Sequence, residues 1–244
     1  MRYLVVFCLA FGVLTPAARA QSTLDDVHLL VNFLPDATVA PSAYLNGGLS
    51  YADYDFVSQT TIGGSVHIPF SRRFEGAAVL QYLNVDPDVG RNRDGLADIL
   101  LNARYLLPTR NVQTAIGGYL TLPVGSDDIG AGDDVALGFF AAWRYGVGRN
   151  TALTATTGLD FVPIGDDYDL ALRLGGGIIH RTSDRFAILG ELYIRTVTDH
   201  VLLAGGFDYR VSPQGRLRGG LGLGLSDETA DYTLSLSYLY NFRR

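Results

Sequence analysis

The sequence is short of several residue types, and each shortage excludes a class of protein. All 19 basic residues are arginine, and the 244 residues include one cysteine, one methionine and one tryptophan. The cysteine is Cys8, so disulfides cannot hold the rest of the chain together. After residue 20, no run reaches the roughly 18 apolar residues of a transmembrane helix, although 48% of the sequence is hydrophobic. If this chain crosses a membrane, it has to do so as a closed β-barrel.

Signals for cofactors, metals and nucleic acid are missing as well. The formal net charge is −6, and basic residues form no cluster, which makes nucleic acid a poor partner. The glycine-rich stretch 219–224 falls within a strand pattern and not between a strand and a helix, so it is not a phosphate loop. No metal-ligand spacing is present. We therefore expect no cofactor, no metal and no nucleic-acid partner.

The first 20 residues have the features of a secretory signal peptide. Arg2 precedes an apolar run over 3–14, and the Ala-Arg-Ala sequence at 18–20 supplies a small-residue cleavage site. We predict a signal peptide at 1–20, a periplasmic or luminal segment at 21–41 and a barrel domain at 42–244. The segment has no clean periodicity and could contain a short helix or an extra strand.

The last strand-like stretch, 231–242, has one apolar and one polar face. Apolar or aromatic residues occupy every second position from Tyr232 to Phe242, with small polar residues between them and Leu239 as the exception. Aromatic residues at both ends and leucines in the middle are typical of a strand that crosses a bilayer. The stretch resembles the C-terminal signal strand of bacterial outer-membrane barrels, which implies the barrel-assembly machinery as a partner. Arg243 and Arg244 follow the aromatic residue, where the signal strand usually ends.

Regular alternation extends over most of the chain. Twelve runs of similar length are each bounded by turn residues, which predicts an all-β, transmembrane, antiparallel up-and-down β-barrel of about 12 strands. A soluble β-sandwich is the alternative reading. The predicted strands are 42–53, 58–70, 74–86, 95–107, 112–124, 135–147, 151–163, 169–181, 186–198, 200–211, 216–226 and 231–242.

The connections between these runs alternate in length and charge. One set is short and mostly basic (71–73, 109–111, 148–150, 182–185, 212–215), and the other is acidic and often longer (53–55, 87–94, 126–134, 164–167, 199, 226–230). Short periplasmic turns and longer outer loops are expected of a barrel with both termini in the periplasm. The loop aspartates are either ordinary turn formers or ligands for divalent cations at the polysaccharide surface.

If the apolar faces meet lipid, the opposite faces line the lumen. Charged residues are costly on the lipid face, about 2 to 4 kcal/mol for arginine at the midplane, which assigns them inward. They either pair across the lumen and fill it or line a narrow polar path. The predicted luminal residues are His67, Glu75, Gln81, Asp98, Asn102, Arg104, Tyr119, Arg144, Asp160, Arg173, Glu191, Arg195, Asp208, Arg210 and Arg218.

One strand carries a family resemblance. Residues 95–105 (GLADILLNARY) are similar to the G-x-x-D-x-x-x-x-x-[KR]-[YF] strand of the outer-membrane transporters grouped as the phenol-degradation MetA-pathway family, with Asp98 and Arg104 at the family-like positions. The resemblance implies passage of small molecules, aromatic ones among them. We therefore expect an outer-membrane channel for passive uptake of small solutes, with outer-membrane lipid and lipopolysaccharide around it.

Two other kinds of function are weighed against this expectation. The first is a structural or surface-interaction barrel whose lumen is filled by side chains. The second is an enzyme: Ser65 and His67 share a face and could form a hydrolase dyad, and Asp199-His200 could belong to an acidic protease rim. The sequence specifies no third catalytic member, so we expect no enzyme activity.

Overall fold

The computed structural model describes residues 24, 26–31, 34–129, 134–164 and 167–242, so the predicted signal peptide lies outside the described residues. Within them, alternating apolar and polar residues form long strands, as a period of two requires. The strands are β1 (Tyr44–Tyr54), β2 (Val57–Pro69), β3 (Phe74–Pro87), β4 (Arg93–Leu96), β5 (Ile99–Leu106), β6 (Gln113–Leu122), β7 (Leu137–Val147), β8 (Thr151–Ile164), β9 (Asp167–Arg181), β10 (Phe186–Arg195), β11 (His200–Arg210), β12 (Gly215–Gly224) and β13 (Tyr232–Asn241).

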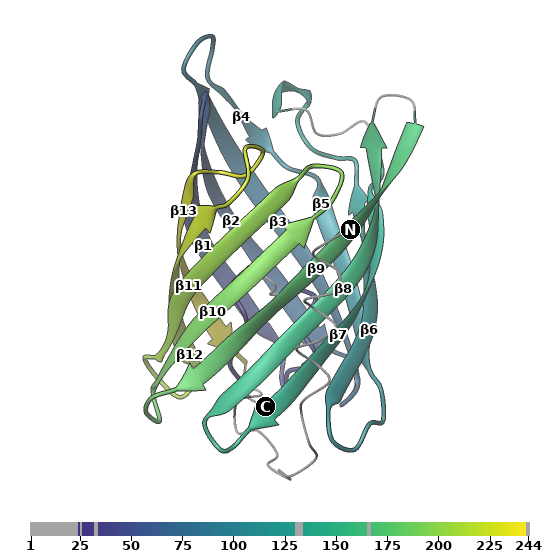
Figure 1. Ribbon diagram of the computed structural model, residues 1–244, viewed down its shortest axis with the longest axis vertical. Coiled ribbons are helices and arrows are strands. Elements are labelled where there is room, and N and C mark those ends of the chain that lie inside the picture. Colours follow the sequence, from purple (N-terminus) through teal and green to yellow (C-terminus); the bar gives the residue numbers. More distant parts are fainter. Residues whose placement is uncertain (1–23, 25, 32–33, 130–133, 165–166, 243–244) are drawn as a thin grey trace.

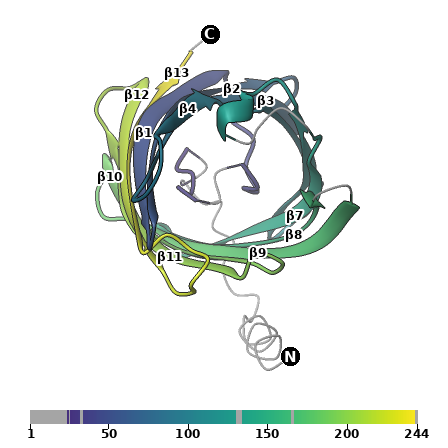
Figure 2. The same ribbon diagram turned by 90° about the horizontal axis from the view of Figure 1, so that it is seen from above.

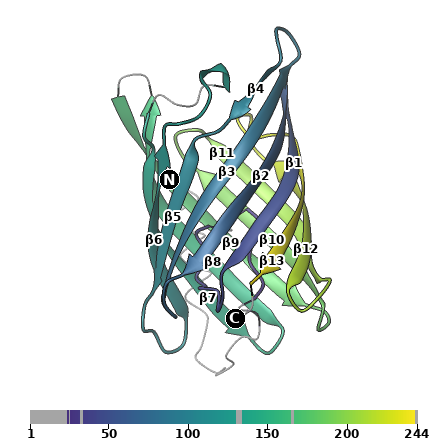
Figure 3. The same ribbon diagram turned by 180° about the vertical axis from the view of Figure 1, so that it is seen from behind.

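The strands form one closed antiparallel barrel (Figures 1 and 3). Strands that follow one another in sequence pair, except β4 and β5, and the first strand β1 closes the ring by pairing with the last, β13. β4 and β5 both pair with β3, so among the described residues the thirteen strands occupy twelve positions around the wall. The predicted twelve-stranded up-and-down barrel is confirmed.

A bulge separates β4 from β5. Tyr82 of β3 lies opposite Leu96, whereas Val79 lies opposite Leu100, so the two residues of β3 between these pairs face three residues of the other strand. Such an extra residue re-aims the side chains on either side of it. The sequence pattern treated 95–107 as one uninterrupted strand, which was wrong at this point.

The two ends of the barrel differ. At the end that we call the short-turn end lie the β2–β3, β5–β6, β7–β8, β9–β10 and β11–β12 connections, together with the start of β1 and the end of β13. The other connections lie at the long-loop end, including β3–β4 and the β6–β7 connection with the 3₁₀ turn η1 (Asp127–Ile129).

The outer face of the barrel is apolar. On β13, Leu234 and Leu236 are 49% and 47% exposed, whereas Leu239, the exception in the alternating pattern, points inward and is 2% exposed. Large apolar side chains are exposed in the same way on every long strand of the wall, such as Ile62 on β2 and Phe139 on β7. An apolar belt of this kind needs lipid around it. No helix within the described residues is long and apolar enough to cross a membrane.

The described residues between 24 and 41 lie inside the barrel, where Figure 2 shows them within the ring of strands. We call them the luminal segment. Leu24, Val27 and Leu29 are fully buried against the inner faces of β8, β9 and β10. Farther along, Ala40 packs against Tyr44 and Leu239. The wall therefore covers these apolar residues of the segment.

Candidate functional site: the barrel lumen

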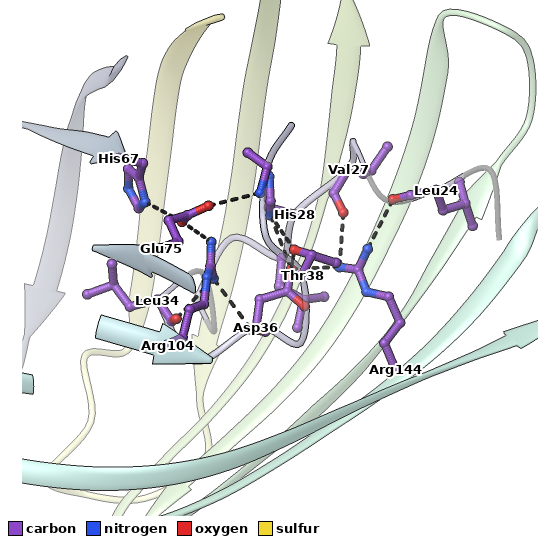
Figure 4. A network of polar contacts seen from close by, with 12 residues as sticks. Leu24, Val27, His28, Leu34, Asp36, Thr38, His67, Glu75, Arg104 and Arg144 are labelled. Atoms are coloured by element: carbon purple, nitrogen blue, oxygen red, sulfur yellow. Dashed lines mark hydrogen bonds and ion pairs between the residues drawn. The ribbon is translucent and has the colours of Figure 1, made fainter. Parts of the chain in front are cut away.

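The luminal segment is held by ion pairs to side chains of the wall (Figure 4). The Arg144 guanidinium on β7 donates hydrogen bonds to the carbonyl oxygens of Leu24 and Val27, each at 3.0 Å, and to the Asp36 carboxylate at 2.6 Å. Within the segment, Asp36 also contacts His28 at 3.2 Å and accepts a hydrogen bond from the Thr38 hydroxyl at 3.3 Å. One arginine of the wall thus fixes two distant parts of the segment.

A second set of contacts lies on the β2, β3 and β5 side. Glu75 forms an ion pair with Arg104, contacts His67 at 3.1 Å and accepts a hydrogen bond from the Ala40 N–H at 2.9 Å. Arg104 also donates to the carbonyl oxygen of Leu34 at 3.2 Å. Buried charges require partners of this kind, and here the backbone of the luminal segment supplies part of them.

A third set of contacts surrounds the start of the segment. Asp26 accepts hydrogen bonds from Arg181 at 2.6 Å and Arg216 at 2.7 Å, and it also pairs with Arg210. Arg218 on β12 donates to the carbonyl oxygens of residues 28 and 29 at 2.7 and 2.6 Å. On β10, the Glu191 carboxylate accepts from the N–H groups of residues 30 and 31. The wall therefore binds the segment along its length.

The ionisable groups of the segment are shifted by these surroundings. Burial lowers the pKa of His28, and Arg104 and Arg144 lower it further, against the opposing effect of Asp36. Burial would raise the pKa of Asp36, but Arg144 and His28 outweigh it, so the pKa is lowered. The same balance, with Arg216 and Arg181 as the main partners, lowers the pKa of Asp26. Docking of the segment therefore favours charged carboxylates and a neutral imidazole.

The segment does not fill the lumen. A hollow of about 230 Å³, which we call the arginine hollow, lies between it and the wall. The arginine hollow is lined by Val31, Leu34, Pro35, Leu100, Asn102, Tyr119, Phe140, Asp160, Arg173 and Arg195. A second hollow of about 280 Å³, the hydroxyl hollow, is lined by serine and threonine side chains of β1, β2 and β13 together with Asn46 and Gln81. Leu34 lines both hollows.

The structure places the sequence-predicted luminal residues in several groups. Nine of them are buried on the inner face: His67, Glu75, Asn102, Arg104, Arg144, Asp160, Glu191, Asp208 and Arg218. Tyr119, Arg173 and Arg195 line the arginine hollow with Asn102 and Asp160, Arg210 pairs with Asp26, and Gln81 lines the hydroxyl hollow. Asp98 lies apart from them at the bulge, where its carboxylate accepts a hydrogen bond from the Gly125 N–H at 2.9 Å.

Sequence reasoning missed five acidic, basic or imidazole side chains of the lumen: Asp26, His28, Asp36, Arg181 and Arg216. A signal for two of them was present, because Arg216 shares a strand face with Arg218 and Arg181 shares one with Arg173. The other three belong to the luminal segment, whose lack of periodicity gave no face to assign.

Ser65 and His67, the first of the two pairs with enzyme-like residue types, contact each other. Ser65 Oγ lies 3.0 Å from Nε2 of His67, and Nδ1 of His67 lies 3.1 Å from Glu75, so a serine, a histidine and a carboxylate stand in a row. Acyl-transfer enzymes use such a row. Here, however, Glu75 is also committed to Arg104 and the luminal segment, and the His67 ring stacks on Tyr44 at 4.2 Å. These contacts tie the row to the neighbouring strands and to the luminal segment.

The other pair lies in a tight turn. Asp199 has a positive φ of 41°, and the His200 ring packs edge-on against Tyr193 at 5.6 Å. Among the described residues, no group of three or more histidine, cysteine or acidic side chains is arranged to hold a metal ion.

A model of one protein family matches most of the chain. The family is described as "Putative MetA-pathway of phenol degradation", and the match extends over residues 36–242, that is, the end of the luminal segment and the whole barrel wall. No curated protein matches the chain.

Solved structures of similar fold are outer-membrane barrels. An outer-membrane channel from Pseudomonas putida F1 has a TM-score of 0.67 at 16% identity, covering 85% of this chain and 98% of that one. The KdgM porin has a TM-score of 0.57 at 12% identity, covering 81% and 99%. The toluene transporter TodX of P. putida has a TM-score of 0.53 at 8% identity, covering 85% and 92%. At these identities the likeness is one of fold.

Proposed function

Because the chain belongs to the family described as "Putative MetA-pathway of phenol degradation", we propose that it is an outer-membrane channel for the passive passage of small solutes. The solutes pass between the luminal segment and the wall, through the arginine hollow or the hydroxyl hollow. The likeness to a channel, a porin and a toluene transporter supports a transport role for this barrel.

The incompletely filled lumen is the observation that carries this proposal. The luminal segment narrows the bore, yet hollows of about 230 and 280 Å³ remain beside it. Twelve strands enclose more space than the eight whose interior side chains can fill. Polar groups of the wall line the hollows together with apolar groups of the wall and of the segment, such as Phe140 and Leu34. A passage of this kind suits small solutes that are partly polar and partly apolar.

The proposed solute path includes the predicted luminal residues that line the hollows. Asn102, Tyr119, Arg173 and Arg195 border one hollow and Gln81 the other. Arg104 and Arg144, by contrast, determine where the segment lies, because their guanidinium groups donate hydrogen bonds to its carbonyl oxygens. We expect weak ion selectivity, because arginines and carboxylates of the lumen largely cancel each other.

Liposome swelling tests this function. Proteoliposomes containing the purified barrel are diluted into isosmotic solutions of uncharged solutes of increasing size, with liposomes lacking protein as the control. We expect swelling that is fastest for the smallest solutes and absent for oligosaccharides. If no solute produces swelling above the control, the channel function is wrong.

A barrel with a filled lumen is the second candidate, and the many contacts between segment and wall favour it. Ion pairs to Asp26 and Asp36 would then serve only to stabilise a closed barrel. The swelling experiment separates the two, because a filled barrel passes nothing.

A further inference from the structure

The arginine hollow contains charged groups that ion pairs within the wall do not fully neutralise. Asn102, Tyr119, Gly138 and Asp160 lie opposite one another on four successive strands, and Arg173 lies opposite Arg195 on the next two. The register therefore brings two guanidinium groups, one carboxylate, one amide and one phenol to the same part of the wall.

The charges of this group do not balance. Arg173 Nη2 lies 3.4 Å from Asp160 Oδ1, and Arg195 Nε lies 3.3 Å from Asp160 Oδ2. Both are ion-pair distances, but neither of these two nitrogen atoms has a hydrogen-bond partner among the described residues. The single carboxylate of Asp160 neutralises one of the two guanidinium charges, so one positive charge of this group remains. Buried donors without partners are costly, which favours a ligand that completes them.

Gly138 and Gly158 leave space for the side chains of this polar group, because neither has a Cβ atom. A Cβ atom at Gly138 would lie 2.5 Å from the Tyr119 ring and 2.6 Å from the Asp160 carboxylate. A Cβ atom at Gly158 would lie 3.0 Å from Nη2 of Arg173. Any other residue at Gly138 would push the phenol and the carboxylate away from each other, so glycine at this position keeps the polar side of the hollow open.

Half of the residues that line the arginine hollow are apolar. They are Leu100 and Phe140 of the wall and Val31, Leu34 and Pro35 of the luminal segment. The Arg173 guanidinium lies 5.3 Å from the centre of the Tyr119 ring, which adds a flat aromatic surface next to the charge. The hollow thus offers a positive, hydrogen-bonding end and an apolar body within about 230 Å³.

We propose that the arginine hollow is a binding site for a small aromatic monocarboxylate, whose carboxylate pairs with Arg173 and Arg195 and whose ring lies against Phe140, Leu100 and Leu34. Guanidinium groups match carboxylate geometry, and a planar ring fits a narrow apolar slot. Within the part of the chain that the structure describes, the Asn102 amide nitrogen has no hydrogen-bond partner, so it can donate to the same carboxylate. Asp160 orients the two arginines and weakens anion binding, so that the solute can leave again. This assignment names a solute class for the proposed channel and rests on that function.

Binding is measured by equilibrium dialysis of radiolabelled benzoate against the full-length barrel in detergent. This assay does not require conduction, so its failure and a failure to swell liposomes are separate results. We expect saturable binding of benzoate, with benzyl alcohol and inorganic phosphate competing at least tenfold more weakly. Benzyl alcohol has the ring without the charge, and phosphate has the charge without the ring. Equal competition by either compound would overturn the proposal, as would absence of benzoate binding.

Substitutions at the polar end give effects in opposite directions. Arg195→Gln should weaken benzoate binding roughly tenfold or more, because a charge-assisted hydrogen bond is lost. Asp160→Asn should strengthen it, because the competing carboxylate is removed. Arg110→Gln, in an exposed turn at the short-turn end, is the matched control and should bind as the wild type does. Heat-modifiable gel migration verifies that each variant is folded. Unchanged binding in folded Arg195→Gln would contradict the assignment.

Discussion

Arg144 and Asp36 form an ion pair of 2.6 Å inside the barrel, although 108 positions separate them in the sequence. Both side chains are almost completely buried. The same guanidinium reaches the carbonyl oxygens of Leu24 and Val27, so this pair joins the wall to both parts of the luminal segment. The width of the passage should depend on it more than on any charge that merely lines the lumen.

Arg144→Gln should release the luminal segment from the wall. Removing one partner of a buried ion pair costs about 3 to 5 kcal/mol, because the other charge is left unpaired. We expect proteinase K to cleave the segment of this variant much faster than that of the wild type in detergent, as followed by mass spectrometry. Arg110→Gln is the control and should be cleaved at the wild-type rate. Equal resistance of the segment in Arg144→Gln would show that the ion pair does not hold it.

Acidification should loosen the segment in two stages. The pKa of His28 is lowered by burial, so its stabilising effect is complete above its ordinary value of 6.5 and is lost as the pH falls below it. The pKa values of Asp36 and Asp26 are also lowered, so their contributions are lost only below about 3.8. Hydrogen exchange of the segment should therefore rise, relative to the barrel strands, between pH 7 and pH 5.

The variant His28→Asn isolates the first stage. It has no imidazole to protonate, so the relative exchange of its segment should stay constant between pH 7 and pH 5. A rise equal to that of the wild type would assign the effect to another group.

The row of Ser65, His67 and Glu75 should have a structural effect and no hydrolytic one. Ser65→Ala removes the hydroxyl that contacts His67 at 3.0 Å, which should destabilise the barrel by about 1 kcal/mol. Hydrolysis of p-nitrophenyl butyrate should be the same in the wild type and in Ser65→Ala, at the background rate. Hydrolysis by the wild type that Ser65→Ala abolishes would instead identify the row as a catalytic triad.

The orientation of the barrel follows from its unequal ends. The long-loop end should face the outside and the short-turn end the periplasm. With Cys8 replaced by serine, Asp88→Cys in the β3–β4 connection should react with an impermeant maleimide on intact cells, whereas Asn150→Cys in the β7–β8 turn should not. Labelling of position 150 alone would reverse the orientation.

The wall of the barrel could be predicted from the sequence because lipid imposes a period of two on every strand. The alternation even assigned Leu239 correctly as an exception, which the structure explains by its contact with Ala40 and Tyr44. The bulge at 97–98 could not be predicted, because it depends on how β3 pairs with two separate strands. The pattern assigned Asp98 to the same face as Arg104, and in the structure its carboxylate accepts a hydrogen bond from the Gly125 N–H beside the bulge.

The partners of the charged luminal residues could not be predicted from the sequence. Periodicity shows which face of a strand a residue occupies, but it does not show that Arg144 meets Asp36 or that Glu75 meets the Ala40 N–H. These contacts join residues far apart in sequence through a segment that has no periodicity of its own. The arginine hollow, which needs both the register of β5 to β10 and that segment, could be recognised only in three dimensions.

Cysteine modification in planar bilayers tests most directly whether solutes pass between the luminal segment and the wall. Asn102 lines the arginine hollow, and Ala103 beside it on β5 is exposed on the outer face of the wall. In a background without Cys8, a methanethiosulfonate reagent should reduce the single-channel current of Asn102→Cys and leave that of Ala103→Cys unchanged. A wild-type barrel that carries no current, or an Asn102→Cys current that the reagent does not alter, would contradict passage through this hollow.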